Sequence, residues 1–197
     1  MFVVFDVETK KIFDEIPDGA HADLGISYLA YYRSDTGRIE GLFEEDVPMF
    51  KEILEQADLI IGYNIIGFDY PVLQGYFACT PEKYTSCDLY QLIYRKHKIH
   101  LKLDNITSST FGSGKIAHGL DAIRFYREGN MDKLKEYCDS DVNLTKELYE
   151  YIIKNKYLYY TDGMGCKIKL ELNIEREMAA SQSPIGSDNE TDGMGLF

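Results

Sequence analysis

The order of the expected elements predicts one α/β domain built on a mixed sheet. Three strands come first, a helix separates them from a fourth strand, and a second helix follows. These elements are expected at residues 2–5, 24–33, 38–43, 46–56, 58–62 and 70–77. The chain of 197 residues is long enough for one such domain and an appendage.

Strand signals are clearest in the first third of the chain. Residues 2–5 are an apolar run, and residues 24–33 are rich in β-branched and aromatic side chains. The turn residues 34–37, with sequence SDTG, predict a hairpin that returns over 38–43. The sheet is therefore expected to begin with three antiparallel strands.

Helix signals dominate the rest of the chain. Apolar side chains spaced for one face indicate the helix at 46–56, and Pro71 suits the first turn of the helix at 70–77. Asp88 is expected to cap a helix over 88–97. Further helices are expected at 103–110, 119–128 and 131–154.

Two appendages are expected after the domain at 1–156. Alternating apolar and polar residues predict a C-terminal hairpin extension at 157–175, with arms at 157–160 and 167–174. Small and polar residues predict a disordered tail at 176–197.

Composition and charge limit the classes of function. No stretch approaches the roughly 20 apolar residues of a membrane span, no secretory signal is recognisable, and the four cysteines lack zinc-binding spacing. We therefore expect no membrane partner and a cytoplasmic location with free thiols. The net charge of −12 predicts that any contact with a polyanion is local or is assisted by metal ions.

Acidic residues follow the first strand and recur in two later segments. Asp6 and Glu8 are two residues apart on an extended chain, so their carboxylates point to the same side and need a cation between them. Asp69 lies near the start of a helix, where it could also be a simple cap. Tyr137 and Asp141 share one face of the long helix, where packing and exposure are the alternative explanation.

Together the three segments resemble a known family. FDVET, GYNIIGFDYPVL and YCDSDVNLT match, in order, the three motifs of the DEDDy-type 3′–5′ exonucleases of the ribonuclease H-like superfamily. The chain is similar to the exonuclease domain of family B DNA polymerases and to small stand-alone bacterial relatives, over residues 2–156. Glu136 stands where the other subgroup carries histidine.

The resemblance implies a ribonuclease H-like (DnaQ-like) mixed five-stranded sheet flanked by helices. It also implies hydrolysis of single-stranded DNA with two divalent cations, Mg²⁺ or Mn²⁺. Tyr137 is expected to orient the attacking water. The implied catalytic and metal-binding acids are Asp6, Glu8, Asp69 and Asp141.

Substrate contacts and partners are less sharply defined by these motifs. Phe68 is expected to stack near the terminal base, with core packing as the alternative, and Asn64 to make a polar contact with the strand. Thr9 is expected to contact the 3′ end, with a turn hydroxyl as the alternative. The basic run at 95–102 is either a phosphate-tracking patch or a solvated helix end. RNA as substrate, and a catalytically silent domain that recruits a helicase or polymerase, stay open. The sequence does not specify the oligomeric state.

Overall fold

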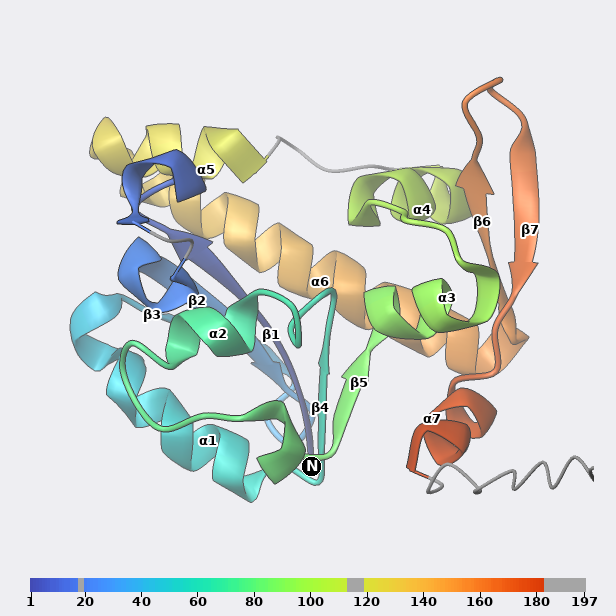
Figure 1. Cartoon of the computed structure of the whole chain (residues 1–197), viewed down its shortest axis with the longest axis horizontal. Coiled ribbons are helices and arrows are strands. Elements are labelled where there is room, and N and C mark those ends of the chain that lie inside the picture. The colour runs from blue at the N-terminus through green and yellow to red at the C-terminus, as the bar shows by residue number, and fades with distance from the viewer. Residues whose placement is uncertain (18–19, 113–118, 183–197) are drawn as a thin grey trace, which may run out of the picture.

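Five strands form a mixed sheet at the centre of the protein (Figure 1). The computed structural model describes residues 1–17, 20–112 and 119–182. The strand order is β3-β2-β1-β4-β5, in which β1, β2 and β3 are antiparallel while β4 and β5 run parallel to β1. The predicted ribonuclease H-like architecture is thus confirmed. The strands are β1 (Phe2–Thr9), β2 (Ile26–Arg33), β3 (Arg38–Leu42), β4 (Leu59–Gly62) and β5 (Ser86–Asp88).

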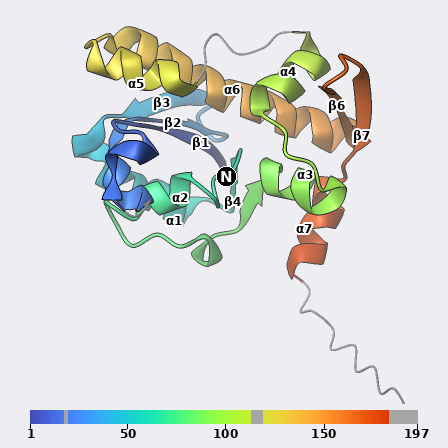
Figure 2. The same cartoon turned by 45° about the horizontal axis from the view of Figure 1, so that its top comes forward.

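Helices cover both faces of this sheet. Figure 2 shows α5 and α6 on one side, with α1 and α2 on the other. The α-helices of the domain are α1 (Phe50–Gln56), α2 (Asp69–Leu73), α3 (Leu89–His97), α4 (Leu103–Phe111), α5 (Gly119–Arg127) and α6 (Met131–Asn155). Short 3₁₀ turns lie at Phe13–Glu15, His21–Leu24, Glu44–Met49 and Pro81–Lys83. None of the helices in the described ranges has the length and apolarity that crossing a bilayer requires.

Alternation along β1 divides its side chains between two hydrophobic cores. Val3, Phe5 and Val7 are buried against α1 and α2, whereas Val4 joins the core beneath α6. Because side chains alternate along a strand, the even-numbered positions after Val4 also face α6. The sheet therefore delivers Asp6 to the inner side of the longest helix.

Two expected helices differ from the structure near their ends. The segment at 46–56 opens as a 3₁₀ turn that contains Pro48, and only Phe50–Gln56 is α-helical. The helix expected at 70–77 ends at Leu73. Past its end, a Cβ on Gly75 would lie 2.6 Å from the carbonyl oxygen of Ala22, so the chain there packs directly against another backbone segment.

The C-terminal segment forms a hairpin and one more helix. Strands β6 (Tyr157–Thr161) and β7 (Lys167–Glu171) pair as expected. Disorder from residue 176 is wrong as far as residue 182, because α7 (Ile174–Gln182) packs beside α3 (Figure 1). Buried Ile174 anchors this helix, and Glu177 pairs with Lys96 at 3.1 Å. The remainder of the expected tail, 183–197, lies outside the described residues.

Candidate active site

Strand β1 carries two carboxylates to the face that α6 covers. The ligand atoms of Asp6, Glu8 and Cys138 all lie within 4.8 Å of one another. The Cys138 thiol is 3.6 Å from Asp6 Oδ2 and 3.5 Å from the Asp6 carbonyl oxygen. Burial, followed by the charges of Asp6 and Glu8, raises the pKa of this thiol. Cys138 is therefore a neutral neighbour of the acids.

Helix α6 adds a tyrosine and a third acid to this cluster. Tyr137 and Asp141 are buried and share one helical face, as their spacing predicted. Burial raises the pKa of the Tyr137 phenol, and the charges of three carboxylates raise it further. Those carboxylates belong to Asp141, Glu8 and Asp6. The phenol is therefore near enough to these acids for their charges to affect it.

Asp69 joins the cluster from the start of α2. The parallel pairing of β1 with β4 ends at Val4, so the Val7 backbone N–H lies beyond that ladder and donates to Asp69 Oδ1 at 3.0 Å. The carboxylate is deeply buried, and its pKa is raised first by desolvation and next by the charge of Asp6. Asp69 is thus a member of the acidic cluster, and the alternative of a plain helix cap is not what the geometry shows.

Asp88 orders the loop that precedes Asp69. Its carboxylate caps α3 by accepting from the Gln91 N–H at 3.1 Å, as the sequence predicted. The same carboxylate also accepts from the N–H groups of Asn64 and Ile66, each at 2.9 Å. Asn64 has a positive φ of 69°, an unusual conformation that these bonds stabilise. Sequence reasoning missed this second role, because no local pattern reports a contact across 22 residues.

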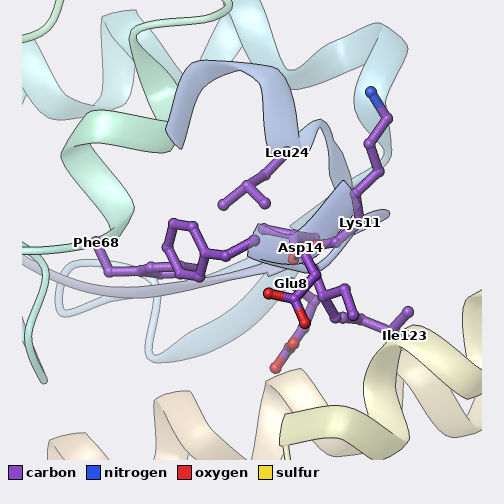
Figure 3. A pocket seen from close by; sticks show the side chains of 9 residues that line it. Glu8, Lys11, Asp14, Leu24, Phe68 and Ile123 are labelled. Atoms are coloured by element: carbon purple, nitrogen blue, oxygen red, sulfur yellow. Dashed lines mark hydrogen bonds between the residues drawn. The ribbon is translucent and has the colours of Figure 1, made fainter. Parts of the chain in front are cut away.

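A cavity of about 520 Å³ opens beside Glu8 (Figure 3). Thr9 and Phe68, two residues for which substrate contacts are predicted, are among those that line it, and so are Phe13 and Ile123. The Phe68 ring meets the Phe13 ring edge-on, with centroids 6.2 Å apart. Phe13 and Ile123 were not predicted, although an aromatic residue shortly after the first motif was a readable signal.

Two expected contacts lie elsewhere. Asn64 does not line the cavity, and its side chain folds over Gly67, where an added Cβ would be 2.6 Å from Asn64 Oδ1. The basic run at 95–102 ends α3 beside the C-terminal segment, where His97 Nε2 contacts the Glu171 carbonyl at 2.9 Å. This placement favours the solvated helix end over a patch at the acidic cluster.

The donor set suits hard divalent cations. Four carboxylates converge from β1, α2 and α6, and their mutual repulsion is relieved when a cation neutralises them. Carboxylate oxygens favour Mg²⁺ or Mn²⁺, whereas the one nearby sulfur is a protonated thiol at ordinary pH. The arrangement can thus hold metal ions next to a tyrosine hydroxyl and an adjoining cavity.

Comparison with known proteins adds a family match and a fold match. The family model of the RNase H superfamily matches residues 3–153, which include every residue of the acidic cluster. The fold is similar to that of the family B DNA polymerase from the hyperthermophilic archaeon Pyrobaculum calidifontis. That match has a TM-score of 0.60 and 20% identity, and covers 77% of this chain but 24% of the polymerase. No curated protein matches the chain.

Removing the Asp88 carboxylate tests its role in the loop. Asp88→Ala leaves three backbone N–H groups without their acceptor, so we expect the free energy of unfolding to fall by about 2–4 kcal/mol. Asn130→Ala, which removes the cap of α6 alone, should cost about 1 kcal/mol. Urea denaturation measures both. Equal losses would show that Asp88 is only a helix cap.

Asp69→Asn tests electrostatic strain in the metal-free protein. The native pKa of Asp69 is raised, so its ionised form destabilises the fold at neutral pH, and that penalty decreases as the pH falls toward 3.8. Asn keeps an oxygen for the Val7 N–H and removes the charge. We therefore expect the variant to melt about 2 °C or more above the wild type in EDTA at pH 7.

Melting curves taken at decreasing pH from 7 toward 3.8 should bring the two proteins together as the wild-type carboxyl gains its proton. Glu136→Gln removes the same charge from an exposed position of α6 and should leave the melting temperature nearly unchanged. An Asp69→Asn protein that melts below the wild type in EDTA would contradict the proposed strain.

Proposed function

Because the chain belongs to the RNase H superfamily, we propose that it is a metal-dependent 3′–5′ exonuclease acting on single-stranded DNA. The observation that carries the proposal is a buried tyrosine beside three acids, one of which, Asp6, acts on the buried fourth acid, next to an open cavity. The acids are Asp6, Glu8, Asp69 and Asp141, and the tyrosine is Tyr137. The domain at 1–156 holds all of them, with the hairpin extension at 157–175 as an appendage.

The acids would hold two divalent cations, Mg²⁺ or Mn²⁺. Asp6, Glu8 and Asp141 would share one ion, and Asp6 and Asp69 would hold the second, directly or through water. When bound, such ions activate water and stabilise the charge that develops at the phosphate. Asp6 lies close to Glu8, and the charge of Asp6 raises the pKa of Asp69. Both observations support this assignment of the acids to two ions.

The chain's own groups would position the water and the 3′ end. The Tyr137 hydroxyl hydrogen-bonds Asp141 and would orient the attacking water. The cavity beside Glu8 has the size of a small-ligand pocket and would accept the terminal nucleotide. Phe68 would contact the terminal base and Thr9 would border its sugar, which favours an unpaired end because only an unstacked base can enter.

DNA is proposed over RNA on the likeness to a DNA polymerase fold. A silent domain that recruits a helicase or polymerase would have no need for four converging acids, so we propose an active enzyme. Such a partner is nevertheless compatible with the activity.

Digestion of labelled strands tests the proposal. With Mn²⁺, the purified protein should convert a 5′-labelled single-stranded DNA into a descending ladder, cut a blunt duplex more slowly and spare a 3′-phosphorylated strand. RNA of the same sequence should react more slowly. Asp6→Asn should abolish both cleavage and the rise in melting temperature that Mn²⁺ causes in the wild type. Rapid cleavage of circular single strands would overturn the assignment in favour of an endonuclease.

Tyr137→Phe separates water positioning from packing. The ring stays and only the hydroxyl is lost, so turnover at saturating substrate should fall roughly 10- to 1000-fold. Tyr28→Phe is the matched control, because the Tyr28 hydroxyl is also near a carboxylate of α6, at 3.5 Å from Asp139 Oδ1. That control should retain near wild-type turnover. An unchanged rate in Tyr137→Phe would refute the catalytic role.

A further inference from the structure

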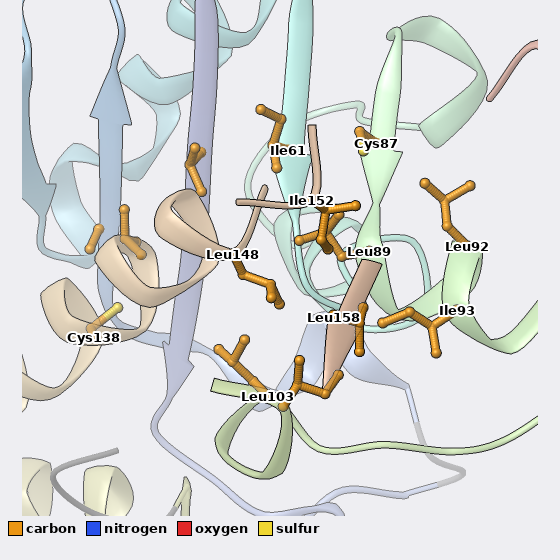
Figure 4. Close-up of a cluster of buried hydrophobic side chains, with 14 of the residues drawn as sticks. Ile61, Cys87, Leu89, Leu92, Ile93, Leu103, Cys138, Leu148, Ile152 and Leu158 are labelled. Atoms are coloured by element: carbon orange, nitrogen blue, oxygen red, sulfur yellow. The ribbon is translucent and has the colours of Figure 1, made fainter. Parts of the chain in front are cut away.

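The β6–β7 hairpin has two chemically different faces. Leu158 and Leu170 point inward, and Leu158 lies beside Leu103 in the core beneath α6 (Figure 4). The side chains between them alternate to the other face, which carries tyrosines from β6 and lysines from β7. The residues of this outer face are Tyr157, Tyr159 and Thr161 of β6 and Lys167, Lys169 and Glu171 of β7.

The tyrosines of the outer face continue an aromatic row. Tyr157 and Tyr159 lie edge to face at 5.5 Å, Tyr151 of α6 meets Tyr157 at 5.7 Å, and Phe111 of α4 meets Tyr151 at 5.6 Å. All four rings are half-buried. The four rings therefore form one continuous edge-to-face aromatic row from α4 across α6 to β6.

Both lysines lie over these rings. Lys169 Nζ is 4.1 Å from the centroid of Tyr157, and Lys167 Nζ is 4.5 Å from that of Tyr159. Glu171 shares the face, but its carboxylate is 3.9 Å from Lys169 Nζ, a loose contact. Cations also lie over single rings elsewhere in the described structure, but here two lysines lie over two neighbouring rings of one hairpin face.

Helix α4 holds the hairpin in place from the side. Asn105 exchanges two hydrogen bonds with the backbone of Thr161, each 2.8 Å long. Thr110 does the same with the backbone of Tyr159, at 3.1 and 3.2 Å. The aromatic row therefore stands on a fixed support.

Helix α6 connects the row to the acidic cluster. Tyr151 lies fourteen positions beyond Tyr137, close to four helical turns, so both are on nearly the same side of α6. The separation along the axis is about 21 Å at about 1.5 Å per residue. That length corresponds to roughly six stacked nucleotides at about 3.4 Å each.

We propose that the outer face of the hairpin binds the single-stranded nucleic acid upstream of the 3′ end that is cut. The tyrosines stack on bases and the lysines contact phosphates, the combination by which proteins hold single strands without reading their sequence. This inference rests on the proposed nuclease function and extends it to the path of the substrate.

Fluorescence anisotropy in EDTA with a 5′-labelled oligothymidine of about 20 nucleotides measures this binding apart from cleavage. Tyr157→Ala/Tyr159→Ala should weaken binding roughly 10- to 100-fold, whereas the corresponding double Phe variant should bind like the wild type. Lys167→Ala/Lys169→Ala should weaken binding and reduce its salt dependence. A strand of about four nucleotides, too short to reach the hairpin, should bind all variants equally.

Lys51→Ala/Lys83→Ala is the charge-matched control. Lys51 is on α1 and Lys83 pairs with Glu55 of the same helix, which lies away from the hairpin in Figure 1. This variant should bind like the wild type. If the Tyr157→Ala/Tyr159→Ala variant fails to fold, the Lys167→Ala/Lys169→Ala variant still tests the proposal, because both lysines are exposed. Wild-type affinity in both hairpin variants, or equal losses in the control, would overturn the proposal and favour a protein partner for this face.

The proposed nuclease function and the proposed role of the hairpin can be refuted independently of each other. Binding that depends on the hairpin without any cleavage under Mn²⁺ would refute the nuclease function and keep the hairpin as a strand-binding surface. Cleavage of long strands with unchanged KM and affinity in the hairpin variants would refute the hairpin inference alone.

Discussion

The hydrogen bond from the Val7 backbone to the Asp69 carboxylate joins the two halves of the candidate site. Strand β1 continues past the point where its pairing with β4 stops, so this N–H needs an acceptor that a strand would otherwise provide. Asp69 supplies it from the first residue of α2. The same bond brings the acid close enough for the charge of Asp6 to raise its pKa. The hydrogen bond that satisfies the Val7 N–H thus also holds Asp69 where the charge of Asp6 repels it.

The surroundings of the acids limit this repulsion without removing it. Cys138 presents a neutral thiol to Asp6 rather than another charge. Asp88 satisfies backbone donors of the loop that leads to Asp69, although its charge also raises the pKa of Asp69, less than the charge of Asp6 does. Buried polar groups are tolerated when each has a partner, and a functional site is where a fold accepts residual electrostatic strain.

Local periodicity was sufficient for the parts of the site that lie within one element. Alternation along β1 placed Asp6 and Glu8 on one side, and the four-residue spacing on α6 paired Tyr137 with Asp141. Mixed-sheet topology followed from the order of strands and helices. The assignment of the acids to one cluster came from the resemblance, since no spacing relates β1 to α6.

Local periodicity and the order of elements could not predict features that depend on tertiary contacts. The sequence predicts Asp88 as a helix cap. Its hydrogen bonds to the N–H groups of Asn64 and Ile66 form only when the loop folds over it. Ile123 reaches the cavity because α5 packs near the end of β1. Helix α7 forms in a polar segment because Ile174 has a core to enter.

The side chains of Asn105 and Thr110 also act as a substitute strand along β6. An unpaired strand edge invites pairing with another chain, and exposed aromatic residues beside it would add to the risk of aggregation. In this hairpin the edge of β6 is already occupied by α4, and β7 carries lysines, which discourage strand addition. The protein can therefore expose a row of tyrosines to solvent without offering the adjoining backbone as a template for self-association.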